Sequence, residues 1–265
     1  MVQDEISAYY RRMGELTRLA SGVGRLEFLR TWDIITRELP PAPVSILDVG
    51  GATGVYAGPL AAAGYRVHLV DPIPEQVAAA AELPGVTAAV GDARDLDQAD
   101  ASVDAVLLFG PLYHLHDRAD RVRAWSEARR VLRPGGLAIA ATISRFASFL
   151  DGVSREFALD PEFRAVTDQD LTDGRHLNPA HVPGWFTTAY FQHTDEIPGE
   201  VADSGLTLDR IVAVETAAAF AGPRLAEMLD DPELFAWAMA AMRRIETEPT
   251  LLGATPHALT IAHRR

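Results

Sequence analysis

Apolar and polar positions follow one pattern near the start of the chain and another from residue 44 onward. Between residues 6 and 39 apolar side chains recur every three or four positions, which predicts one or two helices ending before Pro40. From residue 44 to residue 143 short apolar runs alternate with helix-like stretches, as in a parallel sheet whose strands are joined by crossover helices. The predicted strands are 44–49, 66–71, 86–90, 104–109 and 137–143, and the predicted helices are 56–63, 74–83 and 117–132.

The alternation stops after Ser144. Residues 145–193 combine two polar helical patterns with a cluster of aromatic side chains, which indicates an inserted cap rather than a further strand. The α/β pattern then resumes with a predicted helix, a strand, two helical patterns and a final strand, at 195–203, 206–214, 217–229, 232–246 and 257–263.

Composition narrows the classes of function. The 265 residues, 48% of them apolar, suffice for one large α/β domain with a modest appendage. With 24 Lys and Arg against 37 Asp and Glu, the net charge of −13 repels polyanions, so we expect no nucleic-acid partner. The longest apolar run, at 103–112, is interrupted and far shorter than the roughly 20 residues of a membrane span. We therefore expect no membrane partner, and the acidic start without a secretory pattern predicts a cytoplasmic protein.

Metal chemistry has little support in the sequence. The absence of cysteine excludes disulfides, thiolate nucleophiles and cysteine-ligated metals. The eight histidines are scattered, and His114 and His116, two positions apart, form only a weak metal-binding pattern. We expect no metal cofactor.

A glycine-rich turn closes the first predicted strand. The strand ends at Asp48 and Val49, and residues 50–54, with the sequence GGATG, lead into a helix. Glycine permits a tight turn and lets the backbone approach a ligand at the carboxyl edge of a parallel sheet. Neither the dinucleotide fingerprint GxGxxG nor the Walker A motif fits this spacing. A glycine-rich turn alone therefore leaves the ligand open.

Acidic residues follow the next two predicted strands. Asp71 ends the second strand, where a carboxylate can accept both hydroxyls of a ribose. Asp92 follows the third strand, where a carboxylate or an adjacent backbone amide can meet an adenine edge. A Gly-Pro loop at 110–111 then follows the fourth strand, and Pro-Gly-Gly at 134–136 precedes the fifth.

In this order the motifs resemble the class I S-adenosylmethionine (SAM)-dependent methyltransferases, over roughly residues 44–143 and again in the closing strands. One position departs from the family pattern, because Ala52 stands where the middle glycine is found. The resemblance implies a Rossmann-like, doubly wound α/β fold whose seven-stranded sheet is mostly parallel with a reversed last strand. It also implies SAM as the cofactor and S-adenosylhomocysteine as its product.

The same resemblance assigns cofactor-binding residues. Asp48 lies near the methionine end of SAM, Asp71 holds the ribose, and Asp92 and its neighbours frame the adenine. The full implied set is Asp48, Gly50, Gly51, Gly54, Asp71, Pro72, Asp92, Ala93, Arg94 and Phe109. The expected organisation is an N-terminal helical lid at 1–40, a SAM-binding core at 41–144, the cap at 145–193, and the rest of the core, with a helical insertion, at 194–265.

Catalysis by positioning needs a base only if the acceptor arrives protonated. His114, in the loop after the fourth strand, is the candidate base because imidazole titrates near neutrality, although a packing role is equally open. Tyr113 either lines the acceptor pocket or packs beneath the loop, and Tyr10 is a candidate to close over SAM or belongs to the helix core. Gly110 replaces the polar first residue of the Asn-Pro-Pro-Tyr loop found in methyltransferases of amide and exocyclic nitrogens, which disfavours such substrates.

The expected function is transfer of the SAM methyl group, by in-line displacement, to an N, O or C nucleophile of a small, partly apolar or aromatic metabolite. We expect this acceptor to be enclosed between the N-terminal helices and the cap. Aromatic residues in these added segments are suited to line an enclosed pocket, or they only join the cap to the sheet. Arg145 either pairs an acceptor carboxylate or has a solvent-exposed or salt-bridge role. The candidate acceptor-binding residues are Tyr9, Arg145, Trp185, Phe186 and Tyr190.

Two other functions stay open. One is a catalytically silent SAM-fold subunit or regulator, and the other, disfavoured by the acidic charge, is an RNA or protein methyltransferase. The sequence does not select among the acceptor atoms or fix an oligomeric state.

Overall fold

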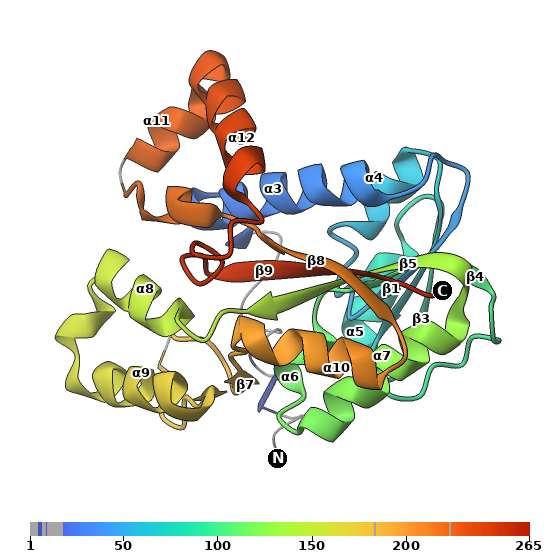
Figure 1. Cartoon of the computed structure of the whole chain (residues 1–265), viewed down its shortest axis with the longest axis horizontal. Helices are drawn as coiled ribbons and strands as arrows, with labels where there is room; N and C mark the ends of the chain where they lie inside the picture. Colours follow the sequence, from blue (N-terminus) through green and yellow to red (C-terminus); the bar gives the residue numbers. More distant parts are fainter. Residues whose placement is uncertain (1–4, 7–8, 10–17, 183, 223) are drawn as a thin grey trace. The chain divides into compact units, whose positions relative to one another are not determined.

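The computed structural model describes residues 5–6, 9, 18–182, 184–222 and 224–265. A seven-stranded sheet has the order β3-β2-β1-β4-β5-β9-β8 (Figure 1). This order, with parallel pairing from β3 through β5, confirms the predicted Rossmann-like, doubly wound fold. The strands are β1 Ser45–Val49, β2 Arg66–Asp71, β3 Val86–Val90, β4 Val103–Leu108, β5 Leu132–Ile143, β8 Thr207–Ala213 and β9 His257–His263.

The central strands β1 and β4 are buried along almost their whole length. Burial on both faces explains why their sequences read as continuous apolar runs rather than as an alternation. In the parallel register Asp48 lies beside Leu69 on β2 and Leu107 on β4, and Asp71 lies beside Val90 on β3. Parallel strands end at the same edge, so Asp48 and Asp71 reach the edge where α/β folds bind ligands.

The last strand is reversed, as predicted. The Ser144 N–H, just past the end of β5, donates to the carbonyl of Pro256, just before β9, at 2.8 Å. The Gly135 N–H, near the start of β5, donates to the carbonyl of Arg264, just past β9, at 2.7 Å. The end of one strand therefore lies beside the start of the other, which is the antiparallel arrangement.

Three stretches differ from the predicted elements. β5 begins at Leu132, not at 137, because the backbone of Gly135 and Gly136 is hydrogen-bonded to Arg264 despite the preceding proline. The loop after β4 contains a short helix, α6 (Pro111–His114), started by its proline. The helical pattern at 217–229 is divided into the 3₁₀ helix η3 (Thr216–Phe220) and α11 (Arg224–Asp230).

Helices that follow the strands cover the sheet. Contacts join α4 and α5 to β2 and β3, and α7 to α10. Arg121 on α7 and Glu200 on α10 are both buried and form an ion pair at 2.8 Å. The bounds are α4 Ala57–Ala62, α5 Pro74–Ala81, α7 Arg118–Val131 and α10 Ile197–Asp203, the last preceded by the 3₁₀ helix η2 Thr194–Glu196.

The two polar helical patterns of the predicted cap form α8 (Ala147–Ser154) and α9 (Pro161–Asp173), with the 3₁₀ helix η1 (Phe157–Leu159) between them. α9 begins where the Asp160 carboxylate accepts the Glu162 N–H and ends at Gly174, which has a φ of +79°. An antiparallel pair then follows, β6 (Arg175–His176) with β7 (Ala189–Tyr190), separate from the large sheet.

The chain divides into two compact units. The insertion unit contains Met1–Asp33, Thr142–Thr194 and Ile211–Leu259, and the glycine-loop unit contains Ile34–Ala141, Asp195–Arg210 and Thr260–Arg265. The insertion unit therefore brings together parts of the N-terminal lid, the cap and the C-terminal segment that the sequence presents as consecutive regions.

Helical packing gives the insertion unit a core of its own. Leu26 on α3 (Gly22–Glu38) packs with Leu225 and Leu229 on α11 and with Met242 on α12 (Pro232–Ile245). Among the described residues, none of the helices combines the length and the apolar character needed to cross a lipid bilayer.

Candidate active site

The glycine loop after β1 needs its glycines for steric reasons. Gly50 has a φ of +74°, and a side chain there would begin 2.7 Å from the Pro111 ring. At Gly51 a Cβ would lie 2.6 Å from the Asp48 carboxylate, and Gly54 has a φ of +85°. These contacts explain the spacing that the sequence analysis singled out.

Ala52, the position that departs from the family pattern, also adopts a left-handed conformation, with a φ of +51°. Its N–H donates to Oδ2 of Asp71 at 3.0 Å, so the loop is held to the end of β2. The left-handed region costs a non-glycine residue roughly 1–2 kcal/mol. The structure therefore shows why glycine suits this place and that alanine is accommodated under strain.

Asp48 is a buried carboxylate with unusual surroundings. Its side chain is 1% exposed, and neither carboxylate oxygen has a hydrogen-bond partner among the described residues. Burial, together with the charge of Asp71, raises the pKa of Asp48 to about 7. The Thr53 hydroxyl of the same loop is also buried and, within the described part of the chain, unpartnered. Buried polar atoms without partners are rare in folded proteins, and here they fit a ligand that carries donors or positive charge.

Thr53 is a site residue that the sequence pattern did not predict. A hydroxyl residue between Ala52 and Gly54 inside a glycine loop was the available signal, but such residues are common in turns of every kind.

Asp71 is fixed by the backbone at the end of β2. Its Oδ1 accepts the Ile73 N–H at 2.9 Å and its Oδ2 accepts the Ala52 N–H. Burial raises the pKa of Asp71, and these two hydrogen bonds oppose the rise. Each carboxylate oxygen retains a further lone pair, so the side chain can still accept two ligand hydroxyls. Pro72 follows directly and is exposed.

Asp92 and Arg94 form a close ion pair after β3. The guanidinium donates from Nη2 to Oδ2 at 2.6 Å and from Nε to Oδ1 at 3.0 Å, and it also reaches Asp120 at 2.8 Å. The hydrogen bonds from Arg94 hold the pKa of Asp92 below its usual range, although partial burial opposes them. Ala93, between the two, is buried. This part of the implied adenine frame is thus charged and rigidly oriented.

The segment after β4 places the candidate base beside two aromatic rings. The Tyr113 hydroxyl donates to the carbonyl of Phe109 at 3.0 Å, and the His114 ring meets the Tyr113 ring edge-on at 4.8 Å. Phe109 in turn meets Tyr56, the residue before α4, at 5.4 Å. Tyr56 was not among the predicted site residues, although an aromatic residue shortly after the glycine loop was a usable signal.

The candidate acceptor residues lie in the insertion unit. Tyr9 meets Phe186 edge-on at 5.3 Å, and Trp185 meets Phe163 at 5.1 Å. Tyr190 lies within 3.2 Å of the Arg145 guanidinium. The third candidate for the catalytic set, Tyr10, lies outside the described residues.

Arg145 also links two segments within the cap by hydrogen bonds. It is buried, and its Nε donates to the carbonyl of Phe191 at 2.8 Å, while its backbone N–H donates to Gln192. The structure thus gives this arginine an internal bonding role in addition to any contact with an acceptor.

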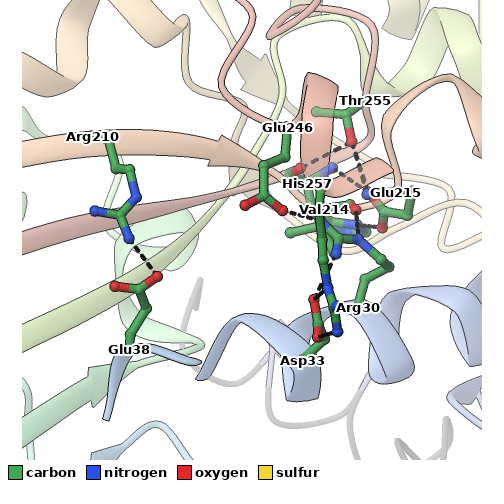
Figure 2. A network of polar contacts seen from close by, with 10 residues as sticks. Arg30, Asp33, Glu38, Arg210, Val214, Glu215, Glu246, Thr255 and His257 are labelled. Carbon is green, nitrogen blue, oxygen red and sulfur yellow. Dashed lines mark hydrogen bonds and ion pairs between the residues drawn. The ribbon is translucent and has the colours of Figure 1, made fainter. Parts of the chain in front are cut away.

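The insertion unit also contains a buried arginine, Arg30, whose guanidinium has several hydrogen-bond partners (Figure 2). Arg30 is 0% exposed, and its two Nη atoms pair with Asp33 at 2.8 Å and Glu246 at 2.6 Å. Its Nε donates to the carbonyl of Val214 at 2.9 Å. Figure 2 shows all three bonds converging on one guanidinium from separate segments of the chain.

One group in the described part of the chain has the residue types of a metal site: Glu27, Glu215 and His257. His257 Nδ1 lies 2.5 Å from Glu215, and Arg18 pairs with Glu27 at 2.6 Å. Burial disfavours the charged imidazole, but the charges of Glu27 and Glu215 outweigh it and raise the pKa of His257 to about 9. Burial likewise opposes the Glu27 carboxylate, yet His257 and Arg18 lower its pKa to about 2.

The Glu27 group is therefore balanced without a metal ion. A protonated imidazole and a guanidinium stand against two carboxylates, and a histidine must lose its proton before it can ligate a metal. The geometry agrees with charge pairing inside the fold.

Comparison with known proteins agrees with this geometry. Residues 47–140 match the family described as the methyltransferase domain. An uncharacterized methyltransferase of Mycobacterium tuberculosis is 43% identical over 99 residues, which cover 37% of this chain and 39% of that protein. A ubiquinone biosynthesis O-methyltransferase of Methylocella silvestris is 37% identical over 111 residues, which cover 40% of this chain and 42% of that protein. The chain thus matches less than half the length of these relatives.

The fold has close counterparts of low sequence identity. An S-adenosylmethionine-dependent methyltransferase of Mesorhizobium loti superposes with a TM-score of 0.61 at 17% identity, covering 90% of this chain and 100% of that one. The matched residues 47–140 include the glycine loop, Asp71 and Asp92, and end within β5. Residues 47–140 thus match the methyltransferase domain in sequence, and the fold is the one seen in S-adenosylmethionine-dependent methyltransferases of known structure.

Proposed function

We propose that this chain is an enzyme that transfers the methyl group of SAM to an N, O or C nucleophile of a small, partly apolar or aromatic metabolite. The observation that carries the proposal is Asp48, a carboxylate that is buried at the ligand-binding edge of the sheet and, among the described residues, unpartnered. A buried carboxylate without a partner is costly to the folded protein, and a cationic ligand removes that cost.

The residues present fit the cofactor. SAM carries an ammonium and a sulfonium, and its methyl group is open to in-line displacement by a nucleophile. Asp48 and the Thr53 hydroxyl would hold the methionine end, and Asp71 would accept the ribose hydroxyls. Asp92, Ala93 and Arg94 would frame the adenine. Gly50, Gly51, Gly54, Pro72 and Phe109 would shape the surrounding surface.

The residues of the chain then act chiefly by positioning, which can supply much of the rate of a displacement reaction. His114 is the proposed base for an acceptor that arrives protonated. The Tyr113 hydroxyl is bonded to the strand end, so its proposed part is to support the His114 ring.

A small acceptor is supported by two features. The net charge of −13 disfavours polyanions. The insertion unit concentrates aromatic side chains, among them Tyr9, Trp185, Phe186 and Tyr190, in contacts suited to apolar ring systems. One relative, moreover, is named for a step of ubiquinone biosynthesis.

The first test measures SAM affinity by calorimetry. Asp71→Ala should weaken binding by about 1.5–3 kcal/mol, because a charge-assisted acceptor for the ribose is lost. Asp100→Ala is the matched control, since it removes an exposed carboxylate that pairs with Arg130. Unchanged affinity in a folded Asp71→Ala protein contradicts the cofactor assignment.

The second test follows the labelled methyl group of SAM into a small-metabolite extract, bulk tRNA and bulk protein. Label in the small-molecule fraction supports the proposal, and label chiefly in tRNA or protein contradicts the acceptor class. SAM binding without transfer to any fraction favours the silent-subunit alternative.

A further inference from the structure

Three buried polar side chains of the insertion unit form a hydrogen-bonded group. Ser148 lies on α8, Asp170 on α9 and His176 on β6, and each is at most 5% exposed. His176 Nδ1 lies 2.8 Å from Oδ2 of Asp170, and the Ser148 hydroxyl donates to the same oxygen. Asp170 therefore fixes a proton on Nδ1 and orients the imidazole.

Two atoms of this group lack hydrogen-bond partners among the described residues. Neither His176 Nε2 nor Oδ1 of Asp170 has a hydrogen-bond partner within the described residues, and both atoms are buried. With Nδ1 protonated, Nε2 offers a lone pair when the ring is neutral and an N–H when it is charged. A group that served packing alone would be expected to satisfy such atoms, as Arg30 does with three partners in the same unit.

The surroundings of the imidazole are aromatic. The Phe191 ring stacks on His176 with centroids 4.5 Å apart and planes 6° from parallel. The Phe186 ring lies 6.3 Å from the His176 ring and also contacts the rings of Phe191 and Tyr9. Flat rings favour a flat, apolar ligand body, and the unpartnered Nε2 of His176 calls for a polar group on that body.

We propose that Ser148, Asp170 and His176 form a binding site for the hydroxyl of a phenolic acceptor, which hydrogen-bonds to His176 Nε2. The inference rests on the proposed function and deepens it by naming the substrate class. Asp170 and Ser148 are positioning residues that hold the imidazole for the ligand. Because Nε2 has no exposed surface, a neighbouring ring must move when the ligand binds. We expect this ring to be Phe186, since Phe186 is partly exposed and Phe191 is buried.

The test compares two probes of almost equal shape, para-nitrophenol and nitrobenzene, in slightly acidic buffer where the phenol keeps its proton. Wild-type protein should bind para-nitrophenol at least about tenfold more tightly, as expected for one well-placed hydrogen bond. His176→Gln should abolish this preference and Asp170→Asn should reduce it. His181→Gln, a change at an exposed histidine, should retain it. Equal binding of both probes to wild type, or an unchanged preference in His176→Gln, overturns the proposal.

A measurement on the wild type covers the case in which the buried variants do not fold. In ¹⁵N-histidine-labelled protein the His176 Nε2 resonance should move on addition of para-nitrophenol and not on addition of nitrobenzene. An unmoved resonance at saturating phenol contradicts the proposal. SAM affinity measured on the same samples keeps the two hypotheses apart, because failure to bind SAM contradicts the proposed function without altering the phenol preference.

Discussion

Two buried charged side chains, Arg30 in the insertion unit and Asp48 in the glycine-loop unit, have opposite hydrogen-bonding surroundings. In the insertion unit Arg30 has no exposed surface, and two carboxylates and a backbone carbonyl take its hydrogen bonds (Figure 2). In the glycine-loop unit Asp48 is 1% exposed, and neither of its oxygens meets a donor among the described residues. Removing a charge from water costs several kcal/mol unless a partner compensates. A buried charge whose hydrogen bonds are satisfied therefore belongs to the fold, whereas a buried charge without partners is a candidate to meet a ligand.

The largest expected effect is on Arg30. Arg30→Leu should lower the free energy of unfolding by about 3–5 kcal/mol, because Asp33 and Glu246 would remain buried without this partner. Urea denaturation measures the change. Arg224→Ala is the matched control, since its pair with Glu227 is exposed and should contribute less than about 1 kcal/mol. Equal effects of the two changes would erase the distinction between bonded buried charge and surface charge.

The second prediction concerns pH. His257 has a folded-state pKa of about 9, above the unfolded value of 6.5, so the folded state binds more protons between these values. The contribution of His257 to the free energy of unfolding is about 3 kcal/mol in total. It is complete below pH 6.5 and is lost as pH rises through 9. His257→Gln should remove this slope from the stability profile. A slope that persists unchanged in the variant would show that other groups produce it.

Asp48 should behave in the opposite way to Arg30. Asp48→Asn should leave stability unchanged or raise it, because an uncompensated buried carboxylate disappears, while SAM affinity falls by about 2 kcal/mol. Since burial and Asp71 raise the pKa of Asp48 to about 7, wild-type binding should also strengthen as pH rises through 7. Calorimetry measures the affinity for SAM, and thermal denaturation measures the stability of the folded protein. A loss of stability like that of Arg30→Leu would make Asp48 a structural residue.

The smallest effect tests the loop around Asp48. Ala52→Gly should stabilise the protein by up to about 1 kcal/mol, because glycine adopts a φ of +51° without strain. Ala78→Gly, inside α5, should destabilise by about 1 kcal/mol, because glycine disfavours helix. The same substitution is therefore expected to change the free energy of unfolding in opposite directions at the two sites. If Ala52→Gly destabilises the protein, the Ala52 methyl group makes a contact that outweighs the backbone strain.

Periodicity in the sequence predicted the strands of the sheet because burial on both faces leaves continuous apolar runs, as in β1 and β4. It missed the start of β5, because hydrogen bonds to Arg264 hold Gly135 and Gly136 in the strand and local glycine propensity cannot reveal such a distant partner.

The candidate site residues also divide into those placed by local order in the sequence and those brought together by tertiary packing. The positions of Asp48 and Asp71 at the ends of consecutive strands were predictable because local order fixes them, whereas their roles toward SAM come from the family resemblance and stay predictions. The Ser148, Asp170 and His176 group was not predicted, because α8, α9 and β6 bring it together only through tertiary packing. Arg30 gave no signal either, since its partner Glu246 lies 216 positions along the chain.

That separation has a consequence for biosynthesis. At translation rates of about 5–20 residues per second, roughly 10 to 40 seconds pass between the synthesis of Arg30 and that of Glu246. The insertion unit is assembled from three segments, the last ending at Leu259, so its charge network cannot close while the chain is still short. Throughout that interval burial of the Arg30 guanidinium lacks one of its two carboxylates, so we expect burial of Arg30 and completion of this unit to be late steps in folding.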